Sequence, residues 1–246
     1  MVMIVGHRGA RNLWPENSLS GFRRTAALGI EAVEFDVHMA RDGVPVVIHD
    51  PSLDRTAHGT GWVAARTSTE LAAVPLRDAG GEGVPTLDAV LGVFAGGATE
   101  LQVEIKTDGG GSPYPGLERA VIDRIRARGL AGRARITCFV PAVLEAARAV
   151  WPEAPLVASL DRRSAEMLGG LEPAIDRFLA FGDCCIAIER TLLAPELDRC
   201  LARIGPDRLG AWVPNDREDV AFWMARPIRQ ITTDRPDVAV DFRAAA

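Results

Sequence analysis

The chain has 246 residues, of which 48% are apolar and 25% are charged, and its formal net charge is −5. This length is sufficient for a large buried core, and the composition is typical of a globular protein. An acidic chain without a basic footprint is a poor binder of nucleic acid, so we expect a small-molecule partner. No apolar run approaches the ~20 residues that cross a bilayer, so no transmembrane segment is expected.

The N-terminal segment and the cysteines predict a compartment. No basic segment leads into a long apolar stretch near the N-terminus, so we expect no secretory signal. The four cysteines lack the spacing of a metal site and are expected to be buried, unpaired thiols of a cytoplasmic protein: Cys138, Cys184, Cys185 and Cys200. The sequence leaves the oligomeric state open.

Nine apolar runs rich in β-branched residues are predicted to be strands. In chain order they are Val2–Val5, Ala32–His38, Val44–His49, Glu100–Lys106, Arg135–Phe139, Leu156–Leu160, Cys184–Glu189, Leu209–Val213 and Ile228–Thr233. Helical patterns lie between most of them, at Ser18–Leu28, Thr86–Phe94, Leu117–Arg128, Pro141–Val150, Ser164–Ala180, Ala194–Ile204 and Glu218–Met224. This alternation predicts parallel strands joined by helices.

Nine strands are one more than a (β/α)8 barrel requires. Only a few residues separate Ala32–His38 from Val44–His49, whereas neighbouring parallel strands need a crossover of about a dozen residues. The pair Asp42-Gly43 between them is typical of a two-residue hairpin, so the later run is predicted to fold back antiparallel. We therefore predict an α/β fold, a single (β/α)8 TIM-barrel domain over residues 1–246, with a small insertion after the second strand at about 40–85.

Polar side chains follow single faces of two predicted strands. Because side chains alternate across a strand, Glu34 and Asp36 share one face, as do Glu104 and Lys106 on a later strand. A regular two-residue turn would set Arg41 opposite Val44, His38 opposite Val47 and Asp36 opposite His49. We therefore expect His49 beside the carboxylates.

Three convergent carboxylates repel one another unless a cation is present. Glu34, Asp36 and Glu104 offer only oxygen ligands, which select a hard divalent cation such as Mg²⁺ or Ca²⁺, with Mn²⁺ as a further option. The alternative is a buried ion network in which these carboxylates pair with Arg8 and Lys106 without a metal. Such a network is expensive to desolvate, so the metal site is the preferred interpretation.

The formal charges indicate the substrate class. Three carboxylates, Arg8, Lys106 and one divalent ion leave a single positive charge, which one phosphodiester would balance. Cationic groups of this kind stabilise phosphorus under attack. His7 and His49 are suited to the two proton transfers, because imidazole titrates near neutral pH. The residues therefore predict hydrolysis of a phosphodiester.

The motifs that carry these residues resemble the glycerophosphodiester phosphodiesterase family. They are His7-Arg8-Gly9, Pro15-Glu16-Asn17-Ser18, Glu34-Phe35-Asp36-Val37, Asp42-Gly43-Val44-Pro45-Val46-Val47-Ile48-His49-Asp50, Leu53-Asp54-Arg55-Thr56, Val84-Pro85-Thr86-Leu87, Val103-Glu104-Ile105-Lys106 and Thr233-Asp234-Arg235-Pro236. The resemblance covers nearly the whole chain and implies a (β/α)8 barrel. It also implies metal ligation by Glu34, Asp36 and Glu104, acid–base roles for His7 and His49, and phosphate contacts from Arg8 and Lys106.

Two features near the expected pocket have alternative interpretations. Trp212 begins Trp212-Val213-Pro214-Asn215, where the family usually has Trp-Thr-Val-Asn; it either stacks on the substrate or packs in the core. Glu16 and Asn17 are possible substrate contacts in the first loop. The preferred interpretation is local, with Asn17 or Ser18 as the cap of the following helix.

The resemblance implies a metal-dependent enzyme that cleaves glycerophosphodiesters to sn-glycerol 3-phosphate and an alcohol. The nearest alternative is a phospholipase D-like relative that acts on lysophospholipids and forms a cyclic phosphate. An alternative of another class is a barrel that binds a metal or phosphate without catalysis. The presence of both His7 and His49 argues against that alternative.

Overall fold

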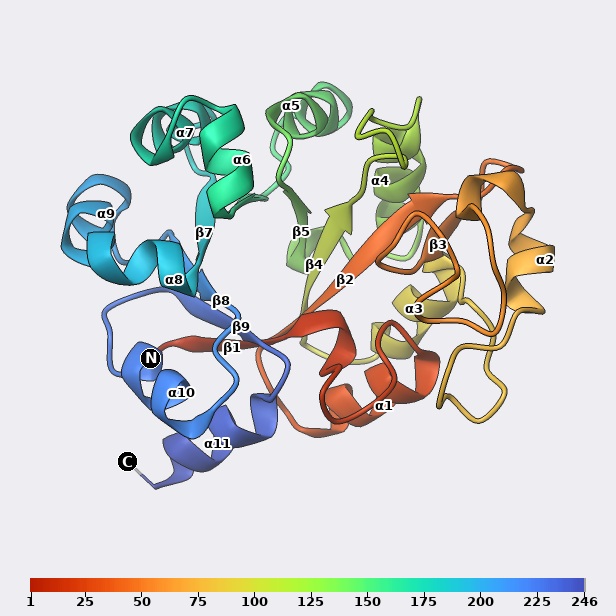
Figure 1. Cartoon of the computed structure of the whole chain (residues 1–246), viewed down its shortest axis with the longest axis horizontal. Helices are drawn as coiled ribbons and strands as arrows, with labels where there is room; N and C mark the ends of the chain where they lie inside the picture. The colour runs from red at the N-terminus through yellow and green to blue at the C-terminus, as the bar shows by residue number, and fades with distance from the viewer. Residues whose placement is uncertain (246) are drawn as a thin grey trace.

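The structure is a computed structural model that describes residues 1–245. In this part of the chain, eight parallel strands close into a barrel (Figure 1). They are β1 (Met3–Gly6), β2 (Ala32–Met39), β4 (Glu100–Ile105), β5 (Ala134–Cys138), β6 (Leu156–Leu160), β7 (Cys185–Glu189), β8 (Leu209–Trp212) and β9 (Gln230–Thr233). Strand β1 pairs with both β2 and β9, which closes the barrel and confirms the predicted TIM-barrel fold.

The remaining strand, β3 (Pro45–Val47), pairs antiparallel with β2, as predicted. Its predicted register was wrong by one residue. The backbone carbonyl of Asp36 accepts a hydrogen bond of 3.0 Å from the backbone N–H of Ile48, so Asp36 does not lie opposite His49. The turn has three residues and ends on Gly43, whose φ is +76°. A left-handed residue at this position is usual in three-residue hairpin loops, so the Asp-Gly pair indicated a hairpin but not its length.

Helices surround the barrel and follow the predicted order. They are α1 (Leu19–Ala27), α3 (Leu87–Phe94), α4 (Leu117–Ala127), α5 (Pro141–Val150), α6 (Arg162–Met167), α7 (Leu171–Leu179), α8 (Arg190–Leu193), α9 (Leu197–Ile204), α10 (Arg217–Met224) and α11 (Pro236–Ala244). The long helix predicted at Ser164–Ala180 is divided into α6 and α7 by Gly169 and Gly170, whose φ values of +92° and +114° are incompatible with a helix. The helices α8 and α11 were not predicted.

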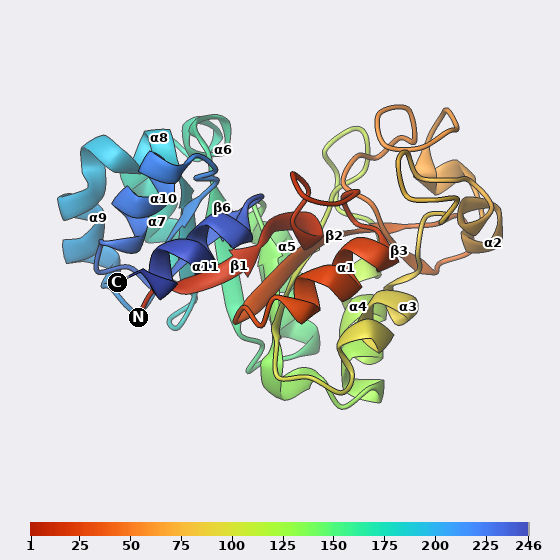
Figure 2. The same cartoon turned by 90° about the horizontal axis from the view of Figure 1, so that it is seen from below.

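The main core lies between the strands and the helices around them. The outward-facing side chains of β2 and β4, among them Phe35 and Val103, are fully buried in it. The insertion carries short helix α2 (Ser68–Ala72) and has a separate apolar cluster, formed by Ala40, Val46, Ile48, Leu53, Ala57, Val63, Leu71, Leu76, Ala79 and Val84. This packing fixes a segment that has little regular secondary structure, and in Figure 2 it projects from one side of the barrel beyond β3.

Two further predictions concern membranes and cysteines. Within residues 1–245, no helix combines the length and apolar character needed to cross a bilayer. All four cysteines are buried and unpaired, as predicted. The two ends of the described chain lie side by side (Figures 1 and 2), where Arg243 donates a hydrogen bond of 2.8 Å to the carbonyl of Val2.

Candidate active site

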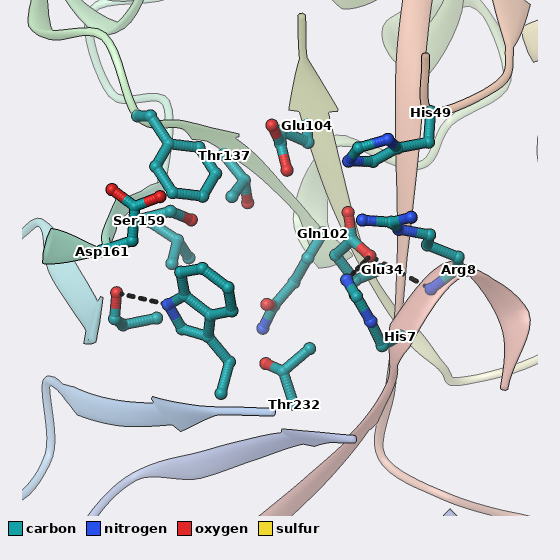
Figure 3. A pocket seen from close by; sticks show the side chains of 14 residues that line it. His7, Arg8, Glu34, His49, Gln102, Glu104, Thr137, Ser159, Asp161 and Thr232 are labelled. Carbon is teal, nitrogen blue, oxygen red and sulfur yellow. Dashed lines mark hydrogen bonds and ion pairs between the residues drawn. The ribbon is translucent and has the colours of Figure 1, made fainter. Parts of the chain in front are cut away.

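Six of the predicted site residues line a cavity of about 200 Å³ at the carboxyl ends of the barrel strands (Figure 3), whereas Asp36 is not among its lining residues and Lys106 lines an adjoining groove. This end of a TIM barrel is where active sites form, because loops from all strands converge there. The lining residues are His7, Arg8, Glu34, His49, Gln102, Glu104, Thr137, Phe139, Val157, Ser159, Asp161, Ala187, Trp212 and Thr232. The cavity thus draws side chains from β2 and β4 through β9 and from the loops after β1 and β3.

The three predicted metal ligands form a buried acidic cluster. Glu34, Asp36 and Glu104 each offer an oxygen within 4.8 Å of the others, and their exposed fractions are 5%, 1% and 8%. Burial raises the pKa of Glu34 well above its usual range, and the neighbouring charges of Asp36 and Glu104 add to this effect. Such a cluster of oxygen donors fits a hard divalent cation, because the cation would offset both the repulsion and the loss of hydration.

The cationic side chains neutralise only part of this cluster. Lys106 lies 2.7 Å from Glu104 Oε1 and 3.2 Å from Asp36 Oδ1, measured from Nζ. The Nε of Arg8 lies 3.5 Å from Asp36 Oδ2. Despite burial, Lys106 and Arg8 hold the pKa of Asp36 far below its usual range. Glu34 has no Lys or Arg partner within ion-pair distance among the described residues, so the alternative ion network leaves one buried carboxylate unpaired.

The loop after β1 aims a backbone group at Glu34. Arg8 has left-handed backbone angles, with φ +50° and ψ +35°, and its N–H donates a hydrogen bond of 3.1 Å to Glu34 Oε2. The next residue, Gly9, also has a positive φ of +72°, and a Cβ there would lie 2.9 Å from the ring of Phe22. Glycine is therefore required for the tight turn that carries His7 and Arg8 to the cavity. The other oxygen of Glu34, Oε1, has no hydrogen-bond partner in the described chain.

His7 is held by a carboxylate from the far end of the chain. Its Nδ1 lies 2.6 Å from Oδ1 of Asp234, directly after β9, and its Nε2 lies 3.8 Å from Glu34 Oε2. Asp234 is fully buried and also accepts hydrogen bonds from Arg11 (2.7 Å) and Asn215 (2.8 Å). Burial lowers the pKa of His7, although the hydrogen bond that His7 donates to Asp234 opposes this effect. The Asp234 contact leaves Nε2 as the ring nitrogen directed to the cavity.

His49 has the same kind of support from a neighbour in sequence. Its Nδ1 lies 2.6 Å from Asp50 Oδ1, and Asp50 accepts a hydrogen bond of 2.6 Å from Arg55 Nε. Burial, together with the charges of Lys106 and Arg8, lowers the pKa of His49 to about 4. Two histidines thus line one cavity, and an aspartate orients each of them (Figure 3 shows His7 and His49 with Arg8 between them).

Arg55 of the insertion connects the support of His49 to that of Arg8. It donates two hydrogen bonds of 2.8 Å to the carboxylate of Glu16, which in turn lies 3.4 Å from Arg8 Nη1. Together with its bonds to Asp50, these contacts use two edges of the planar guanidinium group. The insertion therefore takes part in the geometry of the cavity.

Of the two predicted helix caps, Ser18 caps the helix and Asn17 does not. Ser18 caps α1 by accepting a hydrogen bond of 3.0 Å from Gly21 N–H, as the sequence suggested. Asn17, in contrast, is buried with φ +54° and donates a hydrogen bond of 2.9 Å to Asp36 Oδ2. The asparagine directly before the helix cap was the available signal, but its partner Asp36 lies on β2 and not in the local sequence.

His38 and Trp212 are also in defined positions. His38 Nε2 lies 3.0 Å from the carbonyl oxygen of His49, and its Nδ1 lies 3.0 Å from the hydroxyl of Tyr114. Trp212 lines the cavity, donates a hydrogen bond of 3.0 Å to the carbonyl of Ala187 and meets Phe139 edge-on at 5.5 Å. The Trp212 side chain therefore packs against Phe139 and also faces the cavity.

Sequence and structure comparisons identify the family. A model described as the glycerophosphoryl diester phosphodiesterase family matches residues 7–238. The chain belongs to this family. A glycerophosphodiester phosphodiesterase of Caldanaerobacter subterraneus is 34% identical over 145 residues, which are 56% of this chain and 58% of that relative. One of Bacillus subtilis is 32% identical over 148 residues, which are 54% of this chain and 48% of that relative. The matched regions thus span about half the length of these two relatives.

A solved structure extends the family match to the whole fold. A protein of Agrobacterium tumefaciens described as a glycerophosphoryl diester phosphodiesterase superimposes with a TM-score of 0.89 at 26% identity. The superposition covers 100% of this chain and 98% of that chain. The family resemblance drawn from the motifs is therefore confirmed.

Proposed function

We propose that this protein hydrolyses glycerophosphodiesters to sn-glycerol 3-phosphate and an alcohol. The observation that carries the proposal is the pair of aspartate-supported histidines, His7 and His49, in one cavity with a buried acidic cluster. Proton transfer needs ring nitrogens held in fixed directions, and each Nδ1 contact at 2.6 Å leaves Nε2 for that purpose. Family membership supports the same reaction.

Glu34, Asp36 and Glu104 are proposed to hold one divalent cation, Mg²⁺ or Ca²⁺, with Mn²⁺ as a further option. The unpartnered Oε1 of Glu34 supports this assignment, because a bound cation would stabilise a buried carboxylate oxygen that has no hydrogen-bond donor. When bound, the cation supplies Lewis-acid stabilisation of the phosphate oxygens.

Arg8 and Lys106 are proposed to contribute positive charge at the phosphate. One histidine accepts a proton from the attacking water as its oxygen bonds to phosphorus, and the other donates a proton to the oxygen of the departing alcohol as its bond to phosphorus breaks. Asp234 and Asp50 stabilise the protonated ring in each case, since each accepts the Nδ1 hydrogen. Trp212, beside Phe139, is proposed to contact the organic part of the substrate.

The test is release of glycerol 3-phosphate from glycerophosphocholine and glycerophosphoethanolamine, before and after chelation and with Mg²⁺, Ca²⁺ or Mn²⁺ restored. We expect no activity after chelation and a loss of at least about 100-fold in His7→Gln and in His49→Gln, in line with the usual contribution of acid–base groups. The matched control is His58→Gln, because His58 is exposed in the same insertion and lies outside the cavity.

Undiminished activity of either cavity variant, or of the metal-free protein, would refute the mechanism. Phosphorus NMR of the products distinguishes the proposed reaction from cyclic phosphate formation on a lysophospholipid. A wild-type protein that binds glycerol 3-phosphate but cleaves no diester would support the non-catalytic alternative.

A further inference from the structure

The polar groups that line the cavity differ in whether they have hydrogen-bond partners. Gln102 lines the cavity and exchanges hydrogen bonds of 2.8 and 3.0 Å with the side chain of the buried Gln230, which also lies 3.4 Å from the hydroxyl of the lining residue Thr232. Thr137 differs, because its hydroxyl oxygen is buried and has no hydrogen-bond partner in residues 1–245. A buried hydroxyl without a partner is costly, so its presence in a cavity wall indicates a group that arrives from outside.

Thr137 has a second hydroxyl near it on the next strand. Thr137 lies opposite Glu104 in the β4–β5 pairing and opposite Val157 in the β5–β6 pairing. Ser159 is two residues beyond Val157 on the same face of β6, since side chains alternate along a strand. The exposed fractions of Thr137 and Ser159 are 4% and 7%, and both line the cavity (Figure 3). Two neutral hydroxyls therefore adjoin the acidic cluster on the side opposite His7 and Arg8.

The surroundings divide into an enclosed part and an open part. Most residues that line the 200 Å³ cavity are buried, including Thr137, Ser159 and Gln102. A wider groove of about 680 Å³ adjoins it at His49, Glu104 and Phe139 and runs past residues 108–111 and α6, whose Met167 is 70% exposed. An enzyme that accepts several alcohols needs an open place for the variable group and an enclosed place for the constant one. The enclosed cavity therefore suits the glycerol moiety.

We propose that Thr137 and Ser159 bind the hydroxyl groups of the glycerol moiety and so select glycerol esters over other phosphodiesters. This inference rests on the proposed function. Hydroxyls both donate and accept hydrogen bonds, which matches a diol better than an apolar or cationic group. A site built around a substrate hydroxyl discriminates strongly against an analogue that lacks it, because the buried groups are then left unpaired.

The test compares two ligands of equal carbon number, glycerol 3-phosphate and propyl phosphate, by isothermal titration calorimetry in one Mg²⁺ buffer. Wild type is expected to bind glycerol 3-phosphate more tightly. Thr137→Val and Ser159→Ala are each expected to reduce the ratio of the two affinities by about 3- to 10-fold, the value of one net hydrogen bond. The control Thr69→Val, at an exposed position of α2, should keep the wild-type ratio.

Thermal unfolding without ligand gives an independent measurement. Thr137→Val removes an unpaired hydroxyl, so its melting temperature should equal or exceed that of wild type. Thr25→Val is the opposite case, because the fully buried Thr25 donates a hydrogen bond of 2.8 Å to the carbonyl of Gly9. This second variant should melt below wild type.

An unchanged affinity ratio in both Thr137→Val and Ser159→Ala would overturn the inference, as would a wild type without preference for glycerol 3-phosphate. A lower melting temperature of Thr137→Val with an unchanged ratio would also overturn it, because the hydroxyl would then be structural. Failure of the proposed function gives a different result, namely no release of glycerol 3-phosphate by wild type from any glycerophosphodiester. The binding ratio is measured without turnover, so the two failures are distinguishable.

Discussion

The substitution Glu34→Gln is expected to reverse its effect on stability when a divalent cation is added. Glutamine keeps the size of the side chain and removes its charge. In the metal-free protein, Glu34 lies with Asp36 and Glu104 in a cluster whose ligand oxygens are within 4.8 Å of one another. Two like charges about 5 Å apart repel by about 3 kcal/mol at an effective dielectric constant of about 20.

The net gain for the metal-free variant is smaller than this repulsion. Arg8 already offsets part of it, since its charge opposes the rise in the pKa of Glu34 and its N–H donates to Oε2 at 3.1 Å. We therefore expect Glu34→Gln to stabilise the metal-free protein by about 1–2 kcal/mol, which is about 2–8 °C in melting temperature for a chain of this size.

Added metal should reverse this order. A cation at 100 times its dissociation constant stabilises the folded state by about 2.7 kcal/mol, or about 5–11 °C. The variant keeps only two of the three carboxylates and should gain much less. Wild type should therefore melt below Glu34→Gln in chelator and above it in saturating Mg²⁺ or Ca²⁺.

Differential scanning calorimetry in the two buffers measures both differences. Glu31→Gln is the matched control, because the carboxylate of Glu31 pairs with Arg243 and accepts a hydrogen bond of 2.9 Å from Ile4 N–H, away from the cavity. It should lower the melting temperature equally with and without metal. If Glu34→Gln melts below wild type in chelator, the reasoning fails and the buried ion network without a metal is the better description of the cluster.

Three further predictions follow from contacts outside the acidic cluster. Arg55→Met should lower kcat by about 10- to 100-fold, because Asp50 loses the arginine that holds it against His49. The free energy of unfolding should change by less than about 1 kcal/mol, because the Arg55 side chain is 45% exposed. Steady-state kinetics check this, and a similar loss in the control Arg41→Met would contradict it, since Arg41 bonds only within the insertion and its hairpin. Asp234→Asn should destabilise the protein by about 2–3 kcal/mol at pH 7. Because its partners hold the pKa of Asp234 far below its usual range, this difference should be present above about pH 4 and shrink as the pH falls below it, which urea unfolding at several pH values measures. A thiol reagent should modify none of the four cysteines before unfolding and all four afterwards, because they are buried and burial raises the pKa of Cys138 to about 12; rapid reaction of the native protein would contradict this.

Alternation along strands was enough to predict the acidic cluster, although not the later strands' lining residues such as Thr137 and Ser159. Glu34 and Asp36 lie two residues apart on β2, and Glu104 lies opposite Asp36 on β4, so a parallel barrel brings the three carboxylates together. The position of His49 was predicted correctly for an incorrect reason. The expected register failed because an Asp-Gly pair fits both two- and three-residue loops. His49 still reaches the cavity, because β3 ends at Val47 and the chain leaves the strand before His49.

The sequence predicts the aspartate that binds His49 more readily than the aspartate that binds His7. Asp50 follows His49 directly in the sequence, so a hydrogen bond between the two neighbours could have been predicted. Asp234 lies 227 residues from His7, and no local pattern connects them. The connection follows from barrel closure, because Gly6 lies opposite Thr233 in the parallel β1–β9 pairing, and the residues that come next are His7 and Asp234.

Barrel closure therefore has a direct consequence for the proposed chemistry. The direction of the His7 ring depends on the β1–β9 pairing, whereas that of His49 depends on the insertion through Asp50 and Arg55. Glu16 joins the two regions, since it contacts both Arg8 and Arg55. A change in the β1–β9 pairing therefore acts directly on His7, and a change in the insertion acts directly on His49. Arg8, the proposed phosphate contact, follows His7 in sequence and is connected to the insertion through Glu16. The two ends of the chain and the insertion, which are far apart in sequence, therefore together orient the two histidines proposed for proton transfer.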